Sequence, residues 1–155
     1  MIQLLRVDHR LLHGQVAVSW VQGLGSNCIF CVGDKVANDP VWKTTLKMGK
    51  PAGCKLVIKD MANAIEAINS GVTDKYKMII CVATIAEAKQ LVEGCPQIKS
   101  VNLGNTKRPD ARQVSRQIFL TAAEEADVRE MLDRGVEVEI RPLADDPKVD
   151  CASVL

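Results

Sequence analysis

Short apolar runs alternate with helical patterns along most of the chain, and this alternation restricts the fold more than any other feature. The runs with strand character cover residues 2–7, 28–32, 55–58, 78–82, 101–103, 117–120 and 136–140. Strand, helix and strand in repeated succession form a parallel sheet with helices on both faces. The sequence therefore predicts a doubly wound α/β fold with a mainly parallel, open sheet of about seven strands.

The last apolar run, residues 136–140, alternates apolar and acidic residues. This pattern is typical of a strand at the edge of a sheet, where one face meets water. The direction of this last strand stays open between parallel and antiparallel. The tail that follows, residues 144–155, carries too little pattern for an assignment.

Three of the helical patterns have clear start and stop signals. Asp60 is a candidate N-cap, and the sequences TIAE from Thr84 and TAAE from Thr121 have the spacing of a capping box. Glycines follow the three patterns where helices usually stop, at Gly71, Gly94 and Gly135. We therefore predict helices directly after these three caps.

The composition limits the classes of function. The 155 residues are 47% hydrophobic and 25% charged, which is typical of a folded soluble protein, and the length fits a single domain over residues 1–155. A net charge of +1 and an aromatic content of 3% argue against nucleic-acid binding. No apolar run approaches the ~20 residues that a membrane-spanning helix needs. The N-terminal stretch MIQLLRVDHR lacks signal-peptide features, so we expect a cytoplasmic protein.

Two of the six cysteines, Cys28 and Cys31, form a C-x-x-C pattern inside a predicted strand. Residues three apart on a strand point to opposite faces, so the two sulfur atoms should diverge. The chain has no second C-x-x-C and no suitably spaced histidine pair to complete a zinc site. We interpret these cysteines as core residues and expect neither a metal nor a cofactor.

Both histidines lie in one stretch, RVDHRLLHGQV, which covers residues 6–16. The first predicted strand ends near Val7, and Gly14 opens the following helical pattern. In a parallel sheet, ligands bind at the carboxyl ends of the strands, and a helix start favours anions. The stretch therefore lies where a ligand is expected, although it matches neither G-x-G-x-x-G nor the phosphate loop of nucleotide-binding proteins.

The residue types around His13 suit a phosphohistidine. A neutral imidazole is a good nucleophile toward phosphorus, and Arg10 would neutralise phosphoryl oxygens and disfavour protonation of the ring. Gly14 lets the backbone approach the same oxygens closely. Asp8 could orient Arg10 or accept a hydrogen bond from a ring N–H and so select the tautomer. The alternative from chemistry alone is that His13 is a polar residue satisfied at a helix terminus.

Other residues are expected at the same edge of the sheet. Thr84 is better explained as a helix cap than as a phosphate ligand, and Asp34 as a residue that shapes its loop. Gly104 and Asn105 fit a structural turn and a set of phosphate donors equally well. Six basic residues could form docking patches for an acidic partner or be solvated surface: Lys43, Lys47, Lys50, Lys107, Arg108 and Arg112.

The stretch of residues 6–16 resembles the active-site signature of the enzyme IIB components of the bacterial phosphoenolpyruvate-dependent sugar phosphotransferase system (PTS), mannose/fructose/sorbose family. The usual form is R-I-D-D/E-R-L-I-H-G-Q-V. Weaker similarity continues through Trp20, residues 33–39, residues 101–105 and the closing pattern from Gly135 to Pro142. The signature positions that match are Arg6, Asp8, Arg10, Leu11, His13, Gly14, Gln15 and Val16.

The resemblance implies that His13 accepts a phosphoryl group on Nδ1 from a phosphohistidine of the partner IIA. His13 would then donate the group to a sugar that enters through the membrane subunits IIC and IID, which would recruit the protein to the inner face of the membrane. It also implies Asp8 and Arg10 as catalytic residues and Arg10, Gly14 and Gln15 as phosphate-binding residues. The identity of the sugar and the formation of a homo-oligomer stay open.

This chain departs from the signature at His9, where the family usually has an acid. His9 adds a second imidazole, but we expect His13 to be the acceptor because it keeps the position before Gly-Gln at the helix start. Further residues with weaker support as parts of the site are Arg6, His9, Thr84, Gly104 and Asn105. The competing function is a regulatory or anion-binding module of the same fold that transfers no phosphoryl group.

Overall fold

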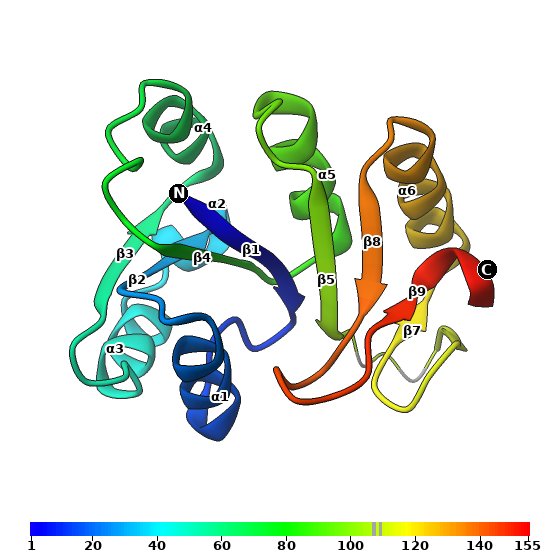
Figure 1. Ribbon diagram of the computed structural model, residues 1–155, viewed down its shortest axis with the longest axis horizontal. Coiled ribbons are helices and arrows are strands. Elements are labelled where there is room, and N and C mark those ends of the chain that lie inside the picture. The colour runs from blue at the N-terminus through cyan, green and yellow to red at the C-terminus, as the bar shows by residue number, and fades with distance from the viewer. Residues whose placement is uncertain (107, 109) are drawn as a thin grey trace.

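In the computed structural model, which describes residues 1–106, 108 and 110–155, the described part of the chain builds a seven-stranded sheet (Figure 1). The strand order is β3-β2-β4-β1-β5-β8-β9, and all neighbouring pairs are parallel except β8 and β9. The strands are β1 (Ile2–Asp8), β2 (Cys28–Val32), β3 (Lys55–Lys59), β4 (Met78–Val82), β5 (Ser100–Asn105), β8 (Glu137–Ile140) and β9 (Val149–Asp150). The predicted mainly parallel α/β sheet is confirmed. The apolar run 136–140 forms β8, which is parallel to β5, and the strand at the end of the sheet, β9, is antiparallel.

Helices cover both faces of the sheet. They are α1 (Gly14–Leu24), α2 (Asp34–Ala37), α3 (Pro40–Met48), α4 (Met61–Asn69), α5 (Ile85–Gly94), α6 (Ala122–Asp133) and the short 3₁₀ helix η1 (Cys151–Val154). In Figure 1, α4, α5 and α6 lie along one face, and α1 and α3 lie on the other. The apolar side chains of these two groups of helices form two separate clusters, one on each side of the sheet.

The side chains of one strand alternate between these two clusters. In β2, Cys28 belongs to the cluster under α4, α5 and α6, whereas Cys31 belongs to the cluster under α1 and α3. The predicted divergence of the two sulfur atoms is therefore confirmed. The six cysteines are all buried and free of disulfide bonds. Burial raises the pKa of the Cys151 thiol to about 11, so this thiol is not activated as a nucleophile.

The three predicted helix starts are present. The Asp60 carboxylate accepts a hydrogen bond from Asn63 N (2.8 Å), and the Thr84 hydroxyl accepts one from Glu87 N (3.1 Å). Thr121 forms a complete capping box with Glu124. The apolar runs did not predict α2 and α3, although Asp39 caps α3 and a proline occupies its first turn.

Two strand predictions were wrong in their placement. Run 117–120 lies outside the main sheet, because its strand β7 (Phe119–Leu120) pairs with β6 (Arg112–Gln113) in a separate antiparallel hairpin. Run 136–140 is not at the edge, because β9 pairs with the outer side of β8. The acidic alternation there has another cause: Glu139 is buried and accepts a hydrogen bond from Asn102 Nδ2 (3.2 Å).

The segment between β8 and β9, residues 141–148, returns to the face of the sheet that carries α1. Trp20 Nε1 donates to the Pro142 carbonyl (3.1 Å), and Ala144 N donates to the Ser19 hydroxyl (3.4 Å). Residues 142–144 are therefore held against α1. Among the described residues, no helix has both the length and the apolar composition that crossing a membrane requires.

Candidate active site

His13 lies at the end of the loop that connects β1 to α1, at the carboxyl edge of the sheet. It is the N-cap residue of α1, with extended backbone (φ −152°), and its carbonyl accepts a hydrogen bond from Ala17 N (3.2 Å). Its side chain makes no capping hydrogen bond and is 21% exposed. The backbone of His13 therefore caps the helix, and its imidazole is available for contacts with other groups.

The loop that carries His13 is held rigidly by backbone contacts. Leu11 N donates to the Asp8 carbonyl (2.7 Å), and Leu11 itself is buried with φ +61°, a conformation that is rare outside glycine. His9 N donates to the Asn105 carbonyl at the end of β5 (3.0 Å). The glycine that opens α1, Gly14, also has a positive φ of 45°. These contacts determine where the loop places the imidazole.

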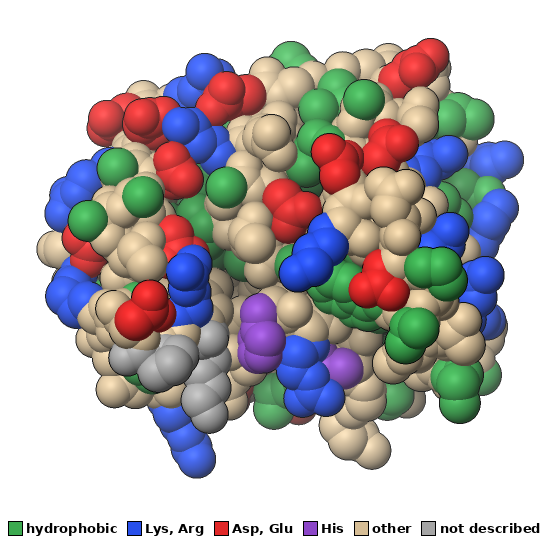
Figure 2. Space-filling model, turned by 180° about the vertical axis from the view of Figure 1, so that it is seen from behind, with side chains coloured by type: hydrophobic (Ala, Val, Ile, Leu, Met, Phe, Trp, Pro, Cys, Tyr) green, Lys and Arg blue, Asp and Glu red, His purple; other side chains and the backbone are tan. Residues whose placement is uncertain are grey.

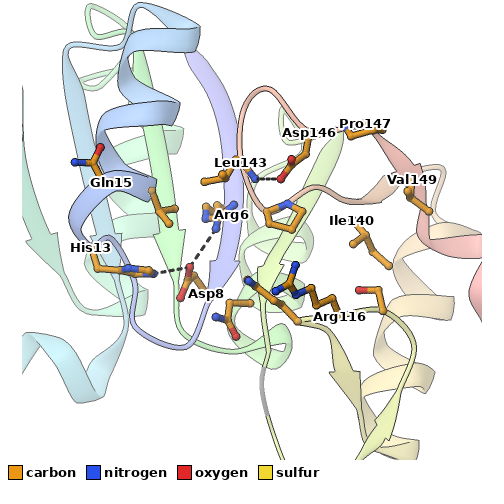
Figure 3. Close-up of a pocket in the computed structure, with 15 residues that line it drawn as sticks. Arg6, Asp8, His13, Gln15, Arg116, Ile140, Leu143, Asp146, Pro147 and Val149 are labelled. Atoms are coloured by element: carbon orange, nitrogen blue, oxygen red, sulfur yellow. Dashed lines mark hydrogen bonds and ion pairs between the residues drawn. The ribbon is translucent and has the colours of Figure 1, made fainter.

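The carboxylate of Asp8 selects the tautomer of His13. It is fully buried, and its Oδ2 lies 3.1 Å from His13 Nε2. The same oxygen accepts a hydrogen bond from Arg6 (3.1 Å), so the carboxylate is ion-paired and acts as an acceptor. His13 Nε2 must then carry the ring proton and donate a hydrogen bond to Asp8, which leaves the lone pair on Nδ1. Figure 3 shows this chain from Arg6 through Asp8 to His13.

Arg6 is the buried end of that chain and is 1% exposed. Its guanidinium donates to Asn102 Oδ1 (3.0 Å) and to the Arg141 carbonyl (3.3 Å), and it lies over the Trp20 ring, 5.6 Å from the centroid. Burial lowers the pKa of Arg6 from its usual value, and the charge of Asp8 opposes that shift. The positive partner of Asp8 is therefore a buried arginine of the same strand, β1, two residues before it.

Gly104 on β5 makes room for this guanidinium. A Cβ atom at Gly104 would lie 2.1 Å from Arg6 Cζ, well inside the distance of closest contact. Arg6 pairs in register with Asn102 on β5, so its side chain crosses this strand directly. Gly104 leaves space for Arg6, and the Asn105 carbonyl accepts a hydrogen bond from His9 N.

We expect Gly104→Ala to destabilise the protein by about 1–3 kcal/mol, because the added methyl group must displace a fully packed, ion-paired side chain. Urea unfolding followed by circular dichroism measures this change. Gly49→Ala is the matched control, since its Cβ would meet ordinary contacts at 3.7 and 3.9 Å and should change stability by less than about 0.5 kcal/mol. Equal effects of the two variants would contradict the close approach to Arg6.

A cavity of about 660 Å³ opens beside the side chains of Arg6, Asp8 and His13 (Figure 3). One wall comes from the end of β1 and the start of α1, with Arg6, Asp8, His13 and Gln15. The facing walls come from the hairpin of β6 and β7, with Arg116, and from residues 142–149, with Leu143 and Asp146; Asn105 at the end of β5 also lines the cavity. The cavity therefore joins the predicted site to two segments that were not predicted to be part of it.

Other predicted site residues lie elsewhere. His9 and Thr84 line a second cavity of about 340 Å³, together with Glu87, whose pKa burial raises. Thr84 is the N-cap of α5, as expected. Arg10 is exposed and lines neither of these two cavities; its backbone amide donates to Asp8 Oδ1 (3.0 Å), and its guanidinium has no hydrogen bond or ion pair with the described residues. In Figure 2 both histidine side chains reach the surface on one face, beside Lys or Arg side chains.

The remaining predictions concern residues outside the two cavities. Asp34 accepts a hydrogen bond from Met61 N (2.9 Å), which agrees with a loop-shaping role. Of the six basic residues proposed for docking, Arg112 is ion-paired with Glu125, and Arg108 lies 3.7 Å from Glu124. Lys107 lies outside the described residues. Within the described part of the chain, no group of three or more His, Cys, Asp or Glu side chains is placed to hold a metal ion.

Sequence reasoning missed Arg116 and the segment that carries Leu143 and Asp146. Arg116 belongs to a short turn between two-residue strands, and residues 142–149 have no periodic pattern. The local sequence holds no signal for either, because only the folding of the chain brings them to the end of β1.

Comparison with known proteins shows the family of this chain. Residues 2–155 match the family described as PTS system sorbose subfamily IIB component. The sorbose-specific EIIB component of Lacticaseibacillus casei is 32% identical over 150 residues, which cover 96% of this chain and 92% of that protein. The mannose-specific EIIAB component of Escherichia coli K12 is also 32% identical, over 96% of this chain. This chain spans 46% of the length of that mannose-specific relative.

Solved structures show the same fold. The IIBSor domain of the sorbose permease from Klebsiella pneumoniae superposes with a TM-score of 0.92 at 27% identity, covering 99% of this chain and 94% of that one. The N-acetylgalactosamine-specific IIB component 1 of Escherichia coli gives a TM-score of 0.86 at 30% identity, covering 97% and 99%. The chain therefore belongs to the sorbose subfamily of PTS IIB components, within the wider mannose and sorbose group.

Proposed function

We propose that this protein is a phosphocarrier and a sugar phosphotransferase subunit in which His13 Nδ1 carries the phosphoryl group. One observation supports this most directly: Asp8 Oδ2 lies 3.1 Å from His13 Nε2, so the ring keeps its proton on Nε2 and has its lone pair on Nδ1. The ring is partly exposed and lines a cavity large enough for a phosphoryl group. The proposal gives Asp8 the role of a positioning residue.

In the first step, phospho-IIA is the donor. The bond between phosphorus and the donor imidazole nitrogen breaks, and its electron pair stays on that nitrogen. The lone pair of His13 Nδ1 forms the new bond to phosphorus, and the ring keeps its Nε2 proton. The positive charge that the His13 ring gains lies next to the Asp8 carboxylate, which stabilises it.

In the second step, a hydroxyl oxygen of the sugar attacks phosphorus. The bond from phosphorus to Nδ1 breaks, its electron pair returns to His13, and the hydroxyl loses its proton to solvent. Catalysis of such a transfer rests mainly on positioning and charge stabilisation. A rigid loop and a fixed tautomer are what the described residues supply for that purpose.

The proposed partners are the IIA component as phosphoryl donor and the IIC and IID membrane subunits as the site of sugar entry. One relative is named an EIIAB component, which supports an A component as the neighbouring protein. The protein would work in the cytoplasm and reach the membrane through these partners. The sugars in the names of the relatives differ, namely sorbose, mannose and N-acetylgalactosamine, so the proposal is limited to the class of sugars.

The test is a phosphorylation assay with phosphoenolpyruvate, enzyme I, the histidine phosphocarrier protein and a IIA component of this family. The expected product is a phosphoryl group that is labile in acid and stable in alkali, mapped to His13 by tandem mass spectrometry. A protein that binds phosphate reversibly and never takes up the label would be the non-catalytic, anion-binding module instead.

Asp8→Asn is expected to slow phosphoryl uptake about ten- to a hundredfold, the usual cost of removing a partner that orients an imidazole. The amide oxygen can still accept a hydrogen bond from the Nε2–H group, but it carries no charge to stabilise the phosphorylated ring. Quench-flow measurement of the transfer rate checks this. Asp146→Asn is the control: Asp146 lines the same cavity but accepts its hydrogen bond from Leu143 N, and its variant should transfer at the normal rate.

A further inference from the structure

The wall of the cavity across from His13 carries a second cation. Arg116 lies in the turn of the β6–β7 hairpin, and in Figure 3 its side chain extends into the cavity that His13, Asp8 and Gln15 line from the other side. The sequence gives no motif around this residue. Its place in the cavity follows from the way the hairpin is attached to the sheet.

The hairpin is attached at the end of β5, next to the loop of His13. Thr106 N donates to the Gln117 carbonyl (3.0 Å), and the Thr106 hydroxyl both donates to the Phe119 carbonyl and accepts from Phe119 N (2.9 Å each). The preceding residue, Asn105, accepts the hydrogen bond from His9 N. The turn and the His13 loop are therefore both fastened to the end of one strand.

The turn itself is tight. Val114 N and Ser115 N both donate to the Ile118 carbonyl (3.0 and 3.3 Å), and Gln113 Nε2 donates to the Arg116 carbonyl (3.4 Å). These hydrogen bonds fix the backbone position of Arg116, and this limits the part of the cavity that its guanidinium can reach. Arg116 thus differs from an arginine on a free loop.

The arginines Arg6, Arg10 and Arg116 differ in how they are paired. Arg6 is buried and committed to Asp8, Asn102 and the Arg141 carbonyl. Arg10 is exposed and does not line the cavity. The Arg116 guanidinium lines the cavity, and it has no hydrogen bond or ion pair with any residue among 1–106, 108 and 110–155. A cation that lacks such a partner and lines the same cavity as His13 is available to an anion.

We infer that Arg116 is a catalytic residue that binds the phosphoryl oxygens while the group is transferred to and from His13 Nδ1. This inference rests on the proposed function. During transfer, the negative charge of the phosphoryl group is spread over three oxygens. A planar guanidinium can donate one hydrogen bond to each of two of these oxygens. Arg116 forms and breaks no covalent bond; phosphorus passes from the donor nitrogen to His13 Nδ1 and then from Nδ1 to the sugar oxygen, as described above.

The test uses phosphoramidate as the phosphoryl donor, so that docking of a partner protein does not affect the rate. The P–N bond of phosphoramidate breaks, ammonia leaves, and the new P–N bond forms at His13. Four proteins are compared: wild type, Arg116→Gln, Arg116→Lys and Arg129→Gln. Arg129 is an exposed arginine of α6 that does not line the cavity, so its variant makes the same change of charge elsewhere.

We expect Arg116→Gln to lower the rate of His13 phosphorylation at least about tenfold, by loss of a donor to the phosphoryl group. Arg116→Lys should recover part of the rate, because it restores the charge without the two-pronged geometry. Arg129→Gln should react at the rate of the wild type. Phosphorus-31 NMR follows the reaction, and circular dichroism verifies that each variant is folded.

The outcomes separate this inference from the function it rests on. A wild-type protein that takes up no phosphoryl group from phosphoramidate or from phospho-IIA overturns the proposed function. A wild-type protein that is labelled normally, together with Arg116→Gln labelled at the same rate, overturns the role of Arg116 alone. The same follows if Arg129→Gln slows the reaction as much as Arg116→Gln does, since the effect would then be one of net charge.

Discussion

Replacing His13 by glutamine is expected to abolish phosphoryl uptake, whereas replacing His9 by glutamine is expected to leave it intact. Glutamine at position 13 can still donate its side-chain N–H to Asp8, so the buried carboxylate keeps a partner, but it offers no nucleophilic nitrogen. The measurement is the fraction of protein labelled at completion in the reconstituted phosphorylation assay.

His9→Gln is the matched control because His9 lies next to the same carboxylate. Its Nδ1 is 3.9 Å from Asp8 Oδ1, beyond hydrogen-bond distance, and its side chain lines the second cavity. Since His9 stands where the family usually has an acid, this pair of variants also tests which imidazole is the acceptor. Label that persists in His13→Gln and disappears in His9→Gln would reverse the assignment.

Arg6→Met is expected to reduce the free energy of unfolding by about 3–5 kcal/mol, the typical cost of removing one partner from a buried ion pair. Methionine would replace the apolar stem of the arginine but not the charged guanidinium that lies over the Trp20 ring. Asp8, which is fully buried, would then keep only neutral donors and the partly exposed His13. Urea unfolding of the two proteins under the same conditions measures the difference.

The double variant Arg6→Met/Asp8→Leu separates the charge effect from lost packing. Removal of both charges leaves no uncompensated carboxylate, so the double variant should be more stable than Arg6→Met alone. In both variants Asn102 on β5 loses the hydrogen bond that Arg6 on β1 donates to it, so this loss does not affect the comparison. A double variant that is less stable than Arg6→Met would show that packing around Arg6, and not the fate of the Asp8 charge, dominates its contribution.

Local patterns in the sequence predicted the central strands well. The runs 28–32 and 78–82 coincide with β2 and β4, which lie in the middle of the sheet and are buried on both faces. Such strands need continuous apolar sequence, and that requirement is visible without the structure. The helix caps at Asp60, Thr84 and Thr121 were equally clear, since a cap depends only on residues within one turn.

The errors occurred where local pattern is absent. The strands β6, β7 and β9 are two residues long, too short for any periodicity, and their pairing depends on turns and on contacts with distant residues. Apolar run 136–140 looked like an edge strand because Glu139 interrupts it. In the structure Glu139 is buried and bonded to Asn102, a contact across 37 positions of the chain.

The sequence alone determined that an imidazole lies at the first helix start, on the carboxyl edge of a parallel sheet, with an acid five residues before it. These relations are short-range, so periodicity, caps and spacing encode them directly. Only the tertiary structure decided that Arg6 crosses β5 over Gly104 and that Arg116 lines the cavity of His13. Both contacts need β1 and β5 to be neighbours, and strand neighbours are chosen by the packing of the whole chain, which no short stretch of residues contains.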